Sequence, residues 1–288
     1  NIQRKIMTTC NSKNVFNIAV KGNFDDCQKI VKQMFNDENF RDKINMSGVN
    51  SINWARIICQ IVYYFYSYFK ISAKVNFSVP TGNFGDVYAG YLAKKLGLPI
   101  NKLIVATNQN DILHRAISKG KYEAEHVSET ISPSMDIQIA SNFERLIYDL
   151  NNHDSSQTLD DMKTIKQNGK YSIDDEKLKK INQDFLSARM SEQETLDVIK
   201  NIYEKFNMVL DPHTAIGYGA FDKHDLKGNN IVLATAHPCK FPDAILKAIN
   251  LKSDLPNELK FILDEKENYG IIENNLKEIK QYILGKIK

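Results

Sequence analysis

The sequence predicts an α/β protein in which a parallel sheet is flanked by helices. Two observations lead to this fold class. A short apolar strand pattern followed by a turn and a helical pattern occurs at residues 15–35, 75–95 and 231–249. Between residues 75 and 106, strand, helix and strand follow one another at the spacing of a parallel βαβ crossover. The 288 residues, 42% apolar and 25% charged, have an ordinary globular composition.

The first of these strand–turn–helix patterns lies in the segment "VFNIAVKGNFDDCQKIVKQMF". Apolar residues from Val15 to Val20 predict a strand, and apolar residues at helical spacing from Ile30 onward predict a helix. The intervening "GNF" is interpreted as an ordinary helix start, capped by Asn23 or Asp25. Asp25 and Asp26 would repel an anion at this position.

A longer helix is predicted to start at Asn50 or Ser51. Its expected buried stripe consists of Ile57, Ile58, Val62, Phe65 and Phe69. The most apolar run of the chain, "IICQIVYYFYSYF", lies in this helix and contains Gln60, Ser67 and four tyrosines. It is too short and too polar to cross a bilayer, so we expect no membrane association.

Alternating apolar residues then predict a strand from Val75 to Val79, followed by a turn over residues 80–86. A helix is expected over residues 87–95, ended by Gly97, and the next strand over 103–106. The polar segment from 151 to 180 is interpreted as a surface excursion with some helix. Further along, we expect a strand at 231–234, a helix from Pro242, and a final strand-like piece and helix within 271–288.

Bulk properties exclude several classes of function. A net charge of +3 is too small to predict nucleic-acid binding. The four cysteines have no metal-binding spacing, so we expect no metal site, and they are consistent with a reduced, cytoplasmic compartment. No signal peptide is evident, and the chain opens without a methionine. We therefore expect these residues to belong to a larger protein.

The second "GNF" lies in the turn Thr81-Gly82-Asn83-Phe84-Gly85-Asp86, between the predicted strand and helix. Glycines three positions apart allow a sharp turn that brings backbone N–H groups close to an anion, and the helix adds its positive N-terminal end. The turn matches neither a Walker loop nor the GxGxxG pattern of dinucleotide-binding proteins. A phosphate site and a tight structural turn both remain open on this local chemistry.

Three further polar motifs carry candidate site residues. Thr235 follows the C-terminal end of a predicted parallel strand. In α/β proteins, ligands bind at the carboxyl ends of such strands. The segment from Asn50 through Ser51 and Asn53 to Arg56 combines polar groups at a helix start with a guanidinium, as in oxyanion sites. In "DPHTAIG", from residue 211, the histidine is interpreted as a satisfied turn residue. Capping and turn formation are the favoured interpretations of each motif taken alone.

Taken together, these motifs closely resemble the threonine synthase family. The resemblance rests on "NSINWAR", "VPTGNFGDVYAGYLAKKLGLP", "ATNQND", "SPSMDIQIASNFERL", "DPHTAIGYGA" and "ATAHPCKFPDA", which follow one another in a single order. It implies a pyridoxal-phosphate enzyme of the tryptophan-synthase-β fold type, fold-type II. It also implies that residues 1–48 are the remainder of a smaller α/β domain and that residues 49–288 are the C-terminal part of an incomplete large, cofactor-binding domain.

The resemblance also implies roles for individual residues. The cofactor phosphate would be held by Gly82, Asn83, Phe84 and Gly85, with Asp86 beside them. Thr235 would be the neutral partner of the pyridine nitrogen, which suits elimination over transamination. The phosphate of the substrate would be bound by Asn50, Ser51, Asn53 and Arg56.

One expected element is absent from the chain. The family's Schiff-base lysine lies in a Phe-Lys-Asp motif upstream of all these motifs, and the chain contains no such motif. We expect no catalytic residue among these residues, and no activity from them alone. The implied reaction converts O-phosphohomoserine and water to threonine and phosphate. Two alternatives are a related phospho-lyase that gives a keto acid and a non-catalytic chain that binds phosphate or pyridoxal phosphate. The sequence predicts no particular oligomeric state.

Overall fold

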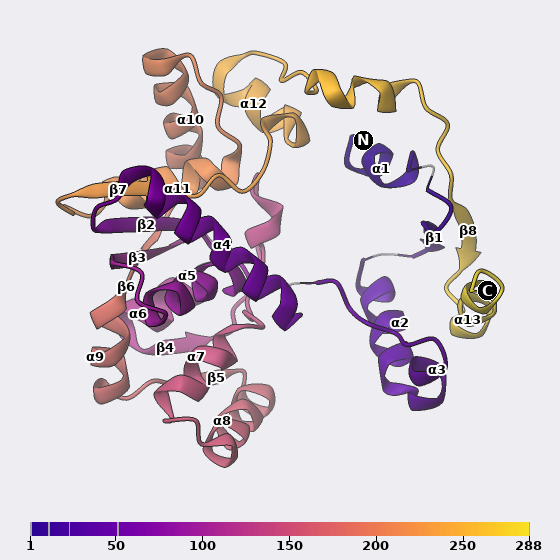
Figure 1. The fold of residues 1–288 in the computed structure, drawn as a ribbon, viewed down its shortest axis with the longest axis horizontal. Helices are drawn as coiled ribbons and strands as arrows, with labels where there is room; N and C mark the ends of the chain where they lie inside the picture. Colours follow the sequence, from indigo (N-terminus) through magenta and orange to yellow (C-terminus); the bar gives the residue numbers. More distant parts are fainter. Residues whose placement is uncertain (1, 11, 23, 51, 288) are drawn as a thin grey trace. The chain divides into compact units, whose positions relative to one another are not determined.

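The computed structural model describes residues 2–10, 12–22, 24–50 and 52–287. The chain divides into two compact units, one made of residues 1–48 and 254–288 and the other of residues 49–253 (Figure 1). The expected ranges were 1–48 and 49–288. The two divisions share the boundary near residue 48, and they differ in where the last 35 residues pack.

The first unit is built around two parallel strands, β1 (Ile18–Lys21) and β8 (Gly270–Glu273), with Ile18 opposite Gly270. Its core contains Ile30, Met34, Phe40 and Ile279. The helical elements of this unit are α1 (Ile2–Thr8), α2 (Phe24–Asn36), α3 (Glu38–Lys43), the 3-10 helix η3 (Asn257–Leu263) and α13 (Leu276–Leu284). Strand β8 and helix α13 match the expected final strand and helix. An isolated strand pattern does not specify its partner strand, and here that partner lies about 250 residues earlier.

The first "GNF" is a helix start, as predicted, because α2 begins at Phe24. Asp25 is already inside this helix, so it is not the capping residue. The other candidate cap, Asn23, lies outside the described residues.

The second unit contains a four-stranded, fully parallel sheet in the order β6-β3-β2-β7. The strands are β2 (Val75–Pro80), β3 (Ile100–Thr107), β6 (Phe185–Arg189) and β7 (Asn229–Val232). Because all four strands are parallel, their carboxyl ends lie along one edge of the sheet. The predicted βαβ crossover is present as β2, α5 (Gly85–Lys95) and β3, and Gly97 beyond α5 has the positive φ of 100° that a helix end favours.

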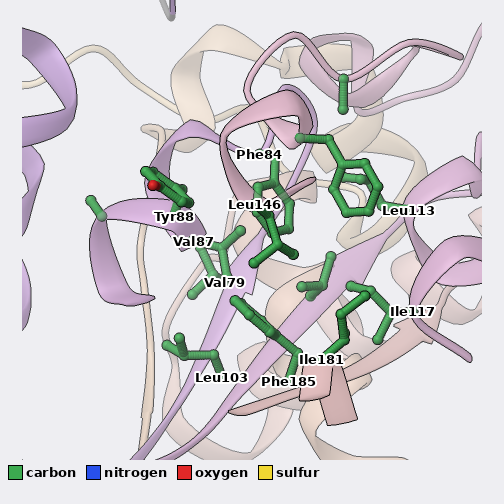
Figure 2. Packing of buried hydrophobic residues seen from close by; sticks show 14 of the residues in the cluster. Val79, Phe84, Val87, Tyr88, Leu103, Leu113, Ile117, Leu146, Ile181 and Phe185 are labelled. Atoms are coloured by element: carbon green, nitrogen blue, oxygen red, sulfur yellow. The ribbon is translucent and has the colours of Figure 1, made fainter. Parts of the chain in front are cut away.

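Helices cover both faces of this sheet, which confirms the predicted parallel sheet flanked by helices. Val75, Phe77 and Val79 of β2 belong to the main core, which they share with α5, α6 (Ile112–Lys119) and α7 (Phe143–Leu150). Figure 2 shows Val79 among side chains of these helices. On the other face, Ile104 and Ala106 of β3 pack against Ile216 and Ala220 of α11 (Pro212–Asp222). The second unit is therefore a three-layer α/β/α arrangement.

The rest of this unit surrounds the sheet. Strands β4 (Lys121–Glu123) and β5 (Lys170–Ser172) form a small antiparallel pair. The polar segment 151–180 contains more regular structure than expected, namely α8 (Ser155–Asn168), β5 and the start of α9 (Asp175–Asp184). The remaining elements are the 3-10 helix η1 (Pro133–Met135), α10 (Glu192–Phe206), η2 (Pro238–Lys240) and α12 (Pro242–Ile249), which begins at the expected proline.

Helix α4 (Trp54–Ile71) corrects one expectation. It begins at Trp54 after an Asn53 cap, later than predicted. Ile57 and Tyr64 are fully buried, but Ile58, Val62 and Phe69 of the expected stripe are 48%, 62% and 66% exposed. The helix is apolar around most of its circumference, so periodicity alone did not distinguish the face that packs on α5. Over the described parts of the chain, α4 included, no helix combines the length and hydropathy that a membrane crossing requires.

Candidate functional site

The glycine turn after β2 is anchored at both ends. The Thr81 amide continues the sheet by donating to the Ala106 carbonyl at 2.8 Å. Phe84 has a left-handed backbone conformation (φ 65°), and its fully buried ring packs against Phe143 and Phe185 with centroids 5.3 and 5.8 Å apart (Figure 2). The core contacts of Phe84 offset the cost of a positive φ at a bulky residue and fix where α5 begins. Only the backbone of Phe84 is therefore available to a ligand.

Gly82 is required by a close backbone approach. A Cβ atom at this position would lie 2.6 Å from the carbonyl oxygen of Ser134, which is a backbone atom that cannot rotate away. The glycine turn and the loop around Ser134 therefore lie in direct contact.

The N-terminus of α5 has the features of an anion site. No side chain caps it, because its N-cap residue is Phe84. Among the described residues, no acceptor pairs with the backbone N–H groups of residues 82–86. Unpaired N–H groups and the positive end of the helix dipole both favour an anion at this end.

The glycine turn is also connected to the segment that precedes α4. Both the backbone N–H and the side-chain amide of Asn142 donate to the carbonyl of Asn83 at 3.1 Å. Arg145 donates to the Asn142 side-chain oxygen at 3.0 Å and to the Ile52 carbonyl at 2.9 Å. Its guanidinium also lies 5.1 Å from the centre of the Trp54 ring. Arg145 thus links two segments that sequence analysis assigned to different phosphate groups.

Some hydrogen-bonding atoms of the predicted substrate-phosphate residues are used in local turns. The side-chain oxygen of Asn50 accepts from the Ile52 amide at 3.1 Å, and that of Asn53 accepts from the Ala55 amide at 2.9 Å. Arg56 is exposed and makes a 3.4 Å contact with the Val49 carbonyl, which leaves most of its donors without a partner among the described residues. Ser51 lies outside the described residues.

Thr235 and the glycine turn follow neighbouring strands of the sheet. It follows β7, which pairs with β2, so both segments leave the sheet at its carboxyl edge. The pairing extends one residue beyond β7, through the Leu233 amide and the Ser78 carbonyl. The Thr235 amide donates to the Thr214 hydroxyl at 3.3 Å, and the residue itself is exposed.

Asp86 occupies the first turn of α5 beside the buried Tyr64. The Tyr64 hydroxyl donates to the backbone carbonyl of Asp86 at 2.7 Å and to its carboxylate at 3.2 Å. Burial raises the pKa of the Asp86 carboxyl to about 6, and the Tyr64 hydrogen bond opposes that shift. Burial also raises the pKa of Tyr64 well above its ordinary value, with the Asp86 charge contributing.

A cleft of about 610 Å³ brings together residues from three of the predicted motifs. Arg56 from α4, Asp86 from α5 and Thr235 beyond β7 all line its wall. Gly82 to Gly85, Asn50 and Asn53 do not line it. A larger cavity of about 1150 Å³ in the same unit is lined by Trp54, Arg145 and residues of α7 and α8, and it contains none of the predicted site residues.

Several residues that organise this site carry no functional signal in the sequence. Arg145 lies in "SNFERL", where it reads as an ordinary helix residue. Asp211, His213 and Thr214 lie in "DPHTAIG", which was interpreted as a turn. Their hydrogen bonds join segments that are far apart in the sequence, so no local pattern signals them.

The sequence and the fold both match one family. The family model for the C-terminal region of threonine synthases matches residues 214–283. Threonine synthase from Pseudomonas aeruginosa is 43% identical over 98% of this chain, and that from Saccharomyces cerevisiae is 45% identical over 94%. The crystal structure of PLP-bound threonine synthase from Brucella melitensis superposes with a TM-score of 0.95 at 44% identity over 99% of this chain.

The relatives are longer than this chain. It spans 61% of the Pseudomonas protein, 59% of the yeast protein and 62% of the Brucella chain. The Brucella match covers 99% of this chain and therefore extends over both units of the fold.

Proposed function

We propose that this chain, which is homologous to the threonine synthases over nearly its whole length, provides the cofactor-phosphate and substrate-phosphate sites of a threonine synthase. The enzyme would convert O-phosphohomoserine and water to threonine and phosphate. The observation that carries the proposal is the meeting of the glycine turn after β2 and Thr235 after β7 at one edge of the sheet, beside the cleft that also contains Arg56.

The residues of this edge fit pyridoxal phosphate. The N–H groups of Gly82, Asn83, Phe84 and Gly85, which no described residue pairs with, and the uncapped end of α5 suit a phosphate dianion. Asp86 is acidic, so we assign it to the wall of the cleft and to the support of α5 through Tyr64, not to the phosphate itself. The exposed Thr235 hydroxyl suits a neutral ring nitrogen.

The substrate phosphate is assigned to the segment at the start of α4. Arg56 supplies a positive charge on the wall of the cleft, and most of its donors have no partner among the described residues. The side-chain oxygens of Asn50 and Asn53 shape the turn that places this segment, by accepting from the Ile52 and Ala55 amides. Ser51 completes the predicted set. A cation at this place stabilises the negative charge that develops on phosphate as it leaves.

Pyridoxal phosphate, when bound, supplies an electron sink for proton removal beside the amino group. In the family, a lysine of the Phe-Lys-Asp motif moves those protons, and that motif is absent from these 288 residues. The chain's own contribution is to bind both phosphates and to hold the ring. Its cysteines are free thiols, which agrees with the cytoplasmic location we propose for the enzyme.

Product analysis tests the proposed reaction. The full-length gene product that contains these residues is incubated with pyridoxal phosphate and O-phosphohomoserine, and phosphate, threonine and keto acid are measured separately. We expect threonine and phosphate in equal amounts. Phosphate with keto acid and ammonia would identify the phospho-lyase alternative, and cofactor binding without phosphate release would identify a non-catalytic chain. Residues 1–288 alone should release no phosphate.

A further inference from the structure

A buried carboxylate lies beneath the proposed cofactor site. Asp211, only 1% exposed, precedes α11 and caps it by accepting from the His213 amide at 2.9 Å and the Thr214 amide at 3.4 Å. A cap needs nothing more. Yet the same carboxylate also accepts from the His213 ring, at 3.1 Å, and from the Thr214 hydroxyl. The two side chains in turn contact segments outside the helix, at the Ser134 and Thr235 amides.

The first branch runs through the His213 ring. The Ser134 amide lies 3.3 Å from His213 Nε2. A backbone N–H only donates, so Nε2 is the acceptor and the neutral ring carries its proton on Nδ1, where it is donated to Asp211. The carbonyl of Ser134 is the atom that leaves no room for a side chain at Gly82. The branch therefore ends against the glycine turn.

The second branch runs through Thr214. Its hydroxyl donates to Asp211, which leaves an oxygen lone pair to accept from the Thr235 amide at 3.3 Å. The order of donors is again fixed, because an ionised carboxylate only accepts and an amide N–H only donates. This branch ends at the proposed partner of the ring nitrogen.

Helix α11 gives both branches a rigid base. Most of its residues are buried, from Pro212 through Gly217. Ser78 of β2 donates to the Gly217 carbonyl at 2.6 Å, and a Cβ at Gly217 would lie 3.0 Å from both Pro80 and Val232. The helix is therefore fixed against the two strands whose ends carry the glycine turn and Thr235.

From these contacts we infer that Asp211, His213 and Thr214 are positioning residues, which set the distance between the cofactor-phosphate turn and the ring-nitrogen partner. This inference rests on the proposed function, since both ends of the network matter only if a phosphate and a ring are held there. The residues touch neither group themselves. They act through the Ser134 and Thr235 amides.

Matched threonine variants test the second branch in the full-length protein. Thr214→Val keeps the shape and removes the hydroxyl, whereas Thr214→Ser keeps the hydroxyl. Thr195→Val is the control, because Thr195 is also buried and donates at 2.8 Å to the carbonyl of Ser191, the N-cap of α10, away from the site. We expect Thr214→Val to shift the absorbance of bound pyridoxal phosphate and to weaken its binding about tenfold. Thr214→Ser and Thr195→Val should match the unsubstituted protein.

Hydrogen exchange tests the same network without the cofactor. Exchange of the Thr235 amide should accelerate in Thr214→Val but not in Thr195→Val, and exchange of the Ser134 amide should accelerate in His213→Phe. Unchanged exchange at these amides would overturn the network. Accelerated exchange with an unchanged cofactor spectrum and affinity would overturn the positioning role. Failure of the unsubstituted protein to bind pyridoxal phosphate would instead overturn the proposed function, and the exchange rates would still decide the network.

Discussion

The hydroxyl of Tyr64 in α4 donates to the backbone carbonyl of Asp86 in α5 at 2.7 Å and reaches the Asp86 carboxylate at 3.2 Å. The fully buried Tyr64 ring also occupies the space beside Gly90, where a Cβ atom would approach within 2.5 Å. Tyr64 thereby holds the first turn of α5, and with it the glycine turn, against α4. It also leaves a carboxylate in a partly buried position on the wall of the cleft.

The Asp86 carboxyl should make stability depend on pH. Its pKa in the folded protein is about 6, above the ordinary value of 3.8, because burial disfavours the charge. The folded state therefore binds this proton more tightly than the unfolded state does, and the resulting stabilisation is present at low pH and lost as the pH rises from about 4 through 6. Asp86→Asn should remove up to about 3 kcal/mol of this pH dependence. Urea unfolding of both proteins at pH 4.5 and pH 7 measures it, and parallel pH profiles would contradict it.

Gly82→Ala should weaken binding of pyridoxal phosphate at least tenfold. The added methyl group would meet the Ser134 carbonyl at 2.6 Å, and the turn would have to move away from the position that suits the phosphate. Gly285→Ala is the matched control, because its methyl group would have ordinary contacts of 3.5 Å and lie in the other unit. The measurement is an absorbance titration with the cofactor. Equal affinity in the two variants would show that the phosphate binds elsewhere.

Thr235→Ala should shift the absorbance maximum of the bound cofactor and lower kcat roughly five- to tenfold, since one hydrogen bond to the ring nitrogen contributes about 1 kcal/mol. Thr235→Ser retains the hydroxyl and should restore both properties. The exposed position of Thr235 makes a large loss of folding stability unexpected in either variant. A Thr235→Ala protein with an unaltered spectrum would limit this residue to a structural role.

Arg145→Lys should raise the KM for O-phosphohomoserine more than it lowers kcat. Lysine keeps the charge but lacks the planar fork that reaches both Asn142 and the Ile52 carbonyl. The start of α4 would then lose its link to the glycine turn. Steady-state kinetics with the substrate varied separate the two effects. The reverse pattern, a lower kcat at constant KM, would argue against this linking role.

The helices and strands that could be predicted from the sequence are those with a clear apolar periodicity or a clear turn motif at their start. Val75, Phe77 and Val79 are all fully buried in β2, and α5 and α12 follow the predicted turns. Helix α4 was harder, because Ile57 and Ile58 are equally apolar and only packing distinguishes the buried residue from the exposed one. The partner of β8 was not predictable either, since pairing across the length of the chain leaves no local signal.

The candidate site shows the same division. Local chemistry identified the glycine turn as an anion site or a tight turn, and it identified Thr235 as a strand-end hydroxyl. It gave no reason to connect them with Asp211 or Arg145. The network of Asp211 reaches the Ser134 and Thr235 amides through His213 and Thr214, and Arg145 reaches the Ile52 carbonyl, and none of these contacts is local in the sequence. Phe84 was expected at the cofactor phosphate, and that assignment stays a prediction for its backbone N–H, because its side chain anchors the turn in the core.

The location of the cofactor phosphate tests this account most directly. It is measured in a crystal structure of the full-length protein with pyridoxal phosphate. We predict that the phosphate oxygens lie about 3 Å from the backbone nitrogens of Gly82 to Gly85, at hydrogen-bond distance, with the Thr235 hydroxyl at the ring nitrogen. A phosphate bound at Arg56, or at the first "GNF" turn near Gly22, with the N–H groups of Gly82 to Gly85 still unpaired, would contradict the assignment of the site.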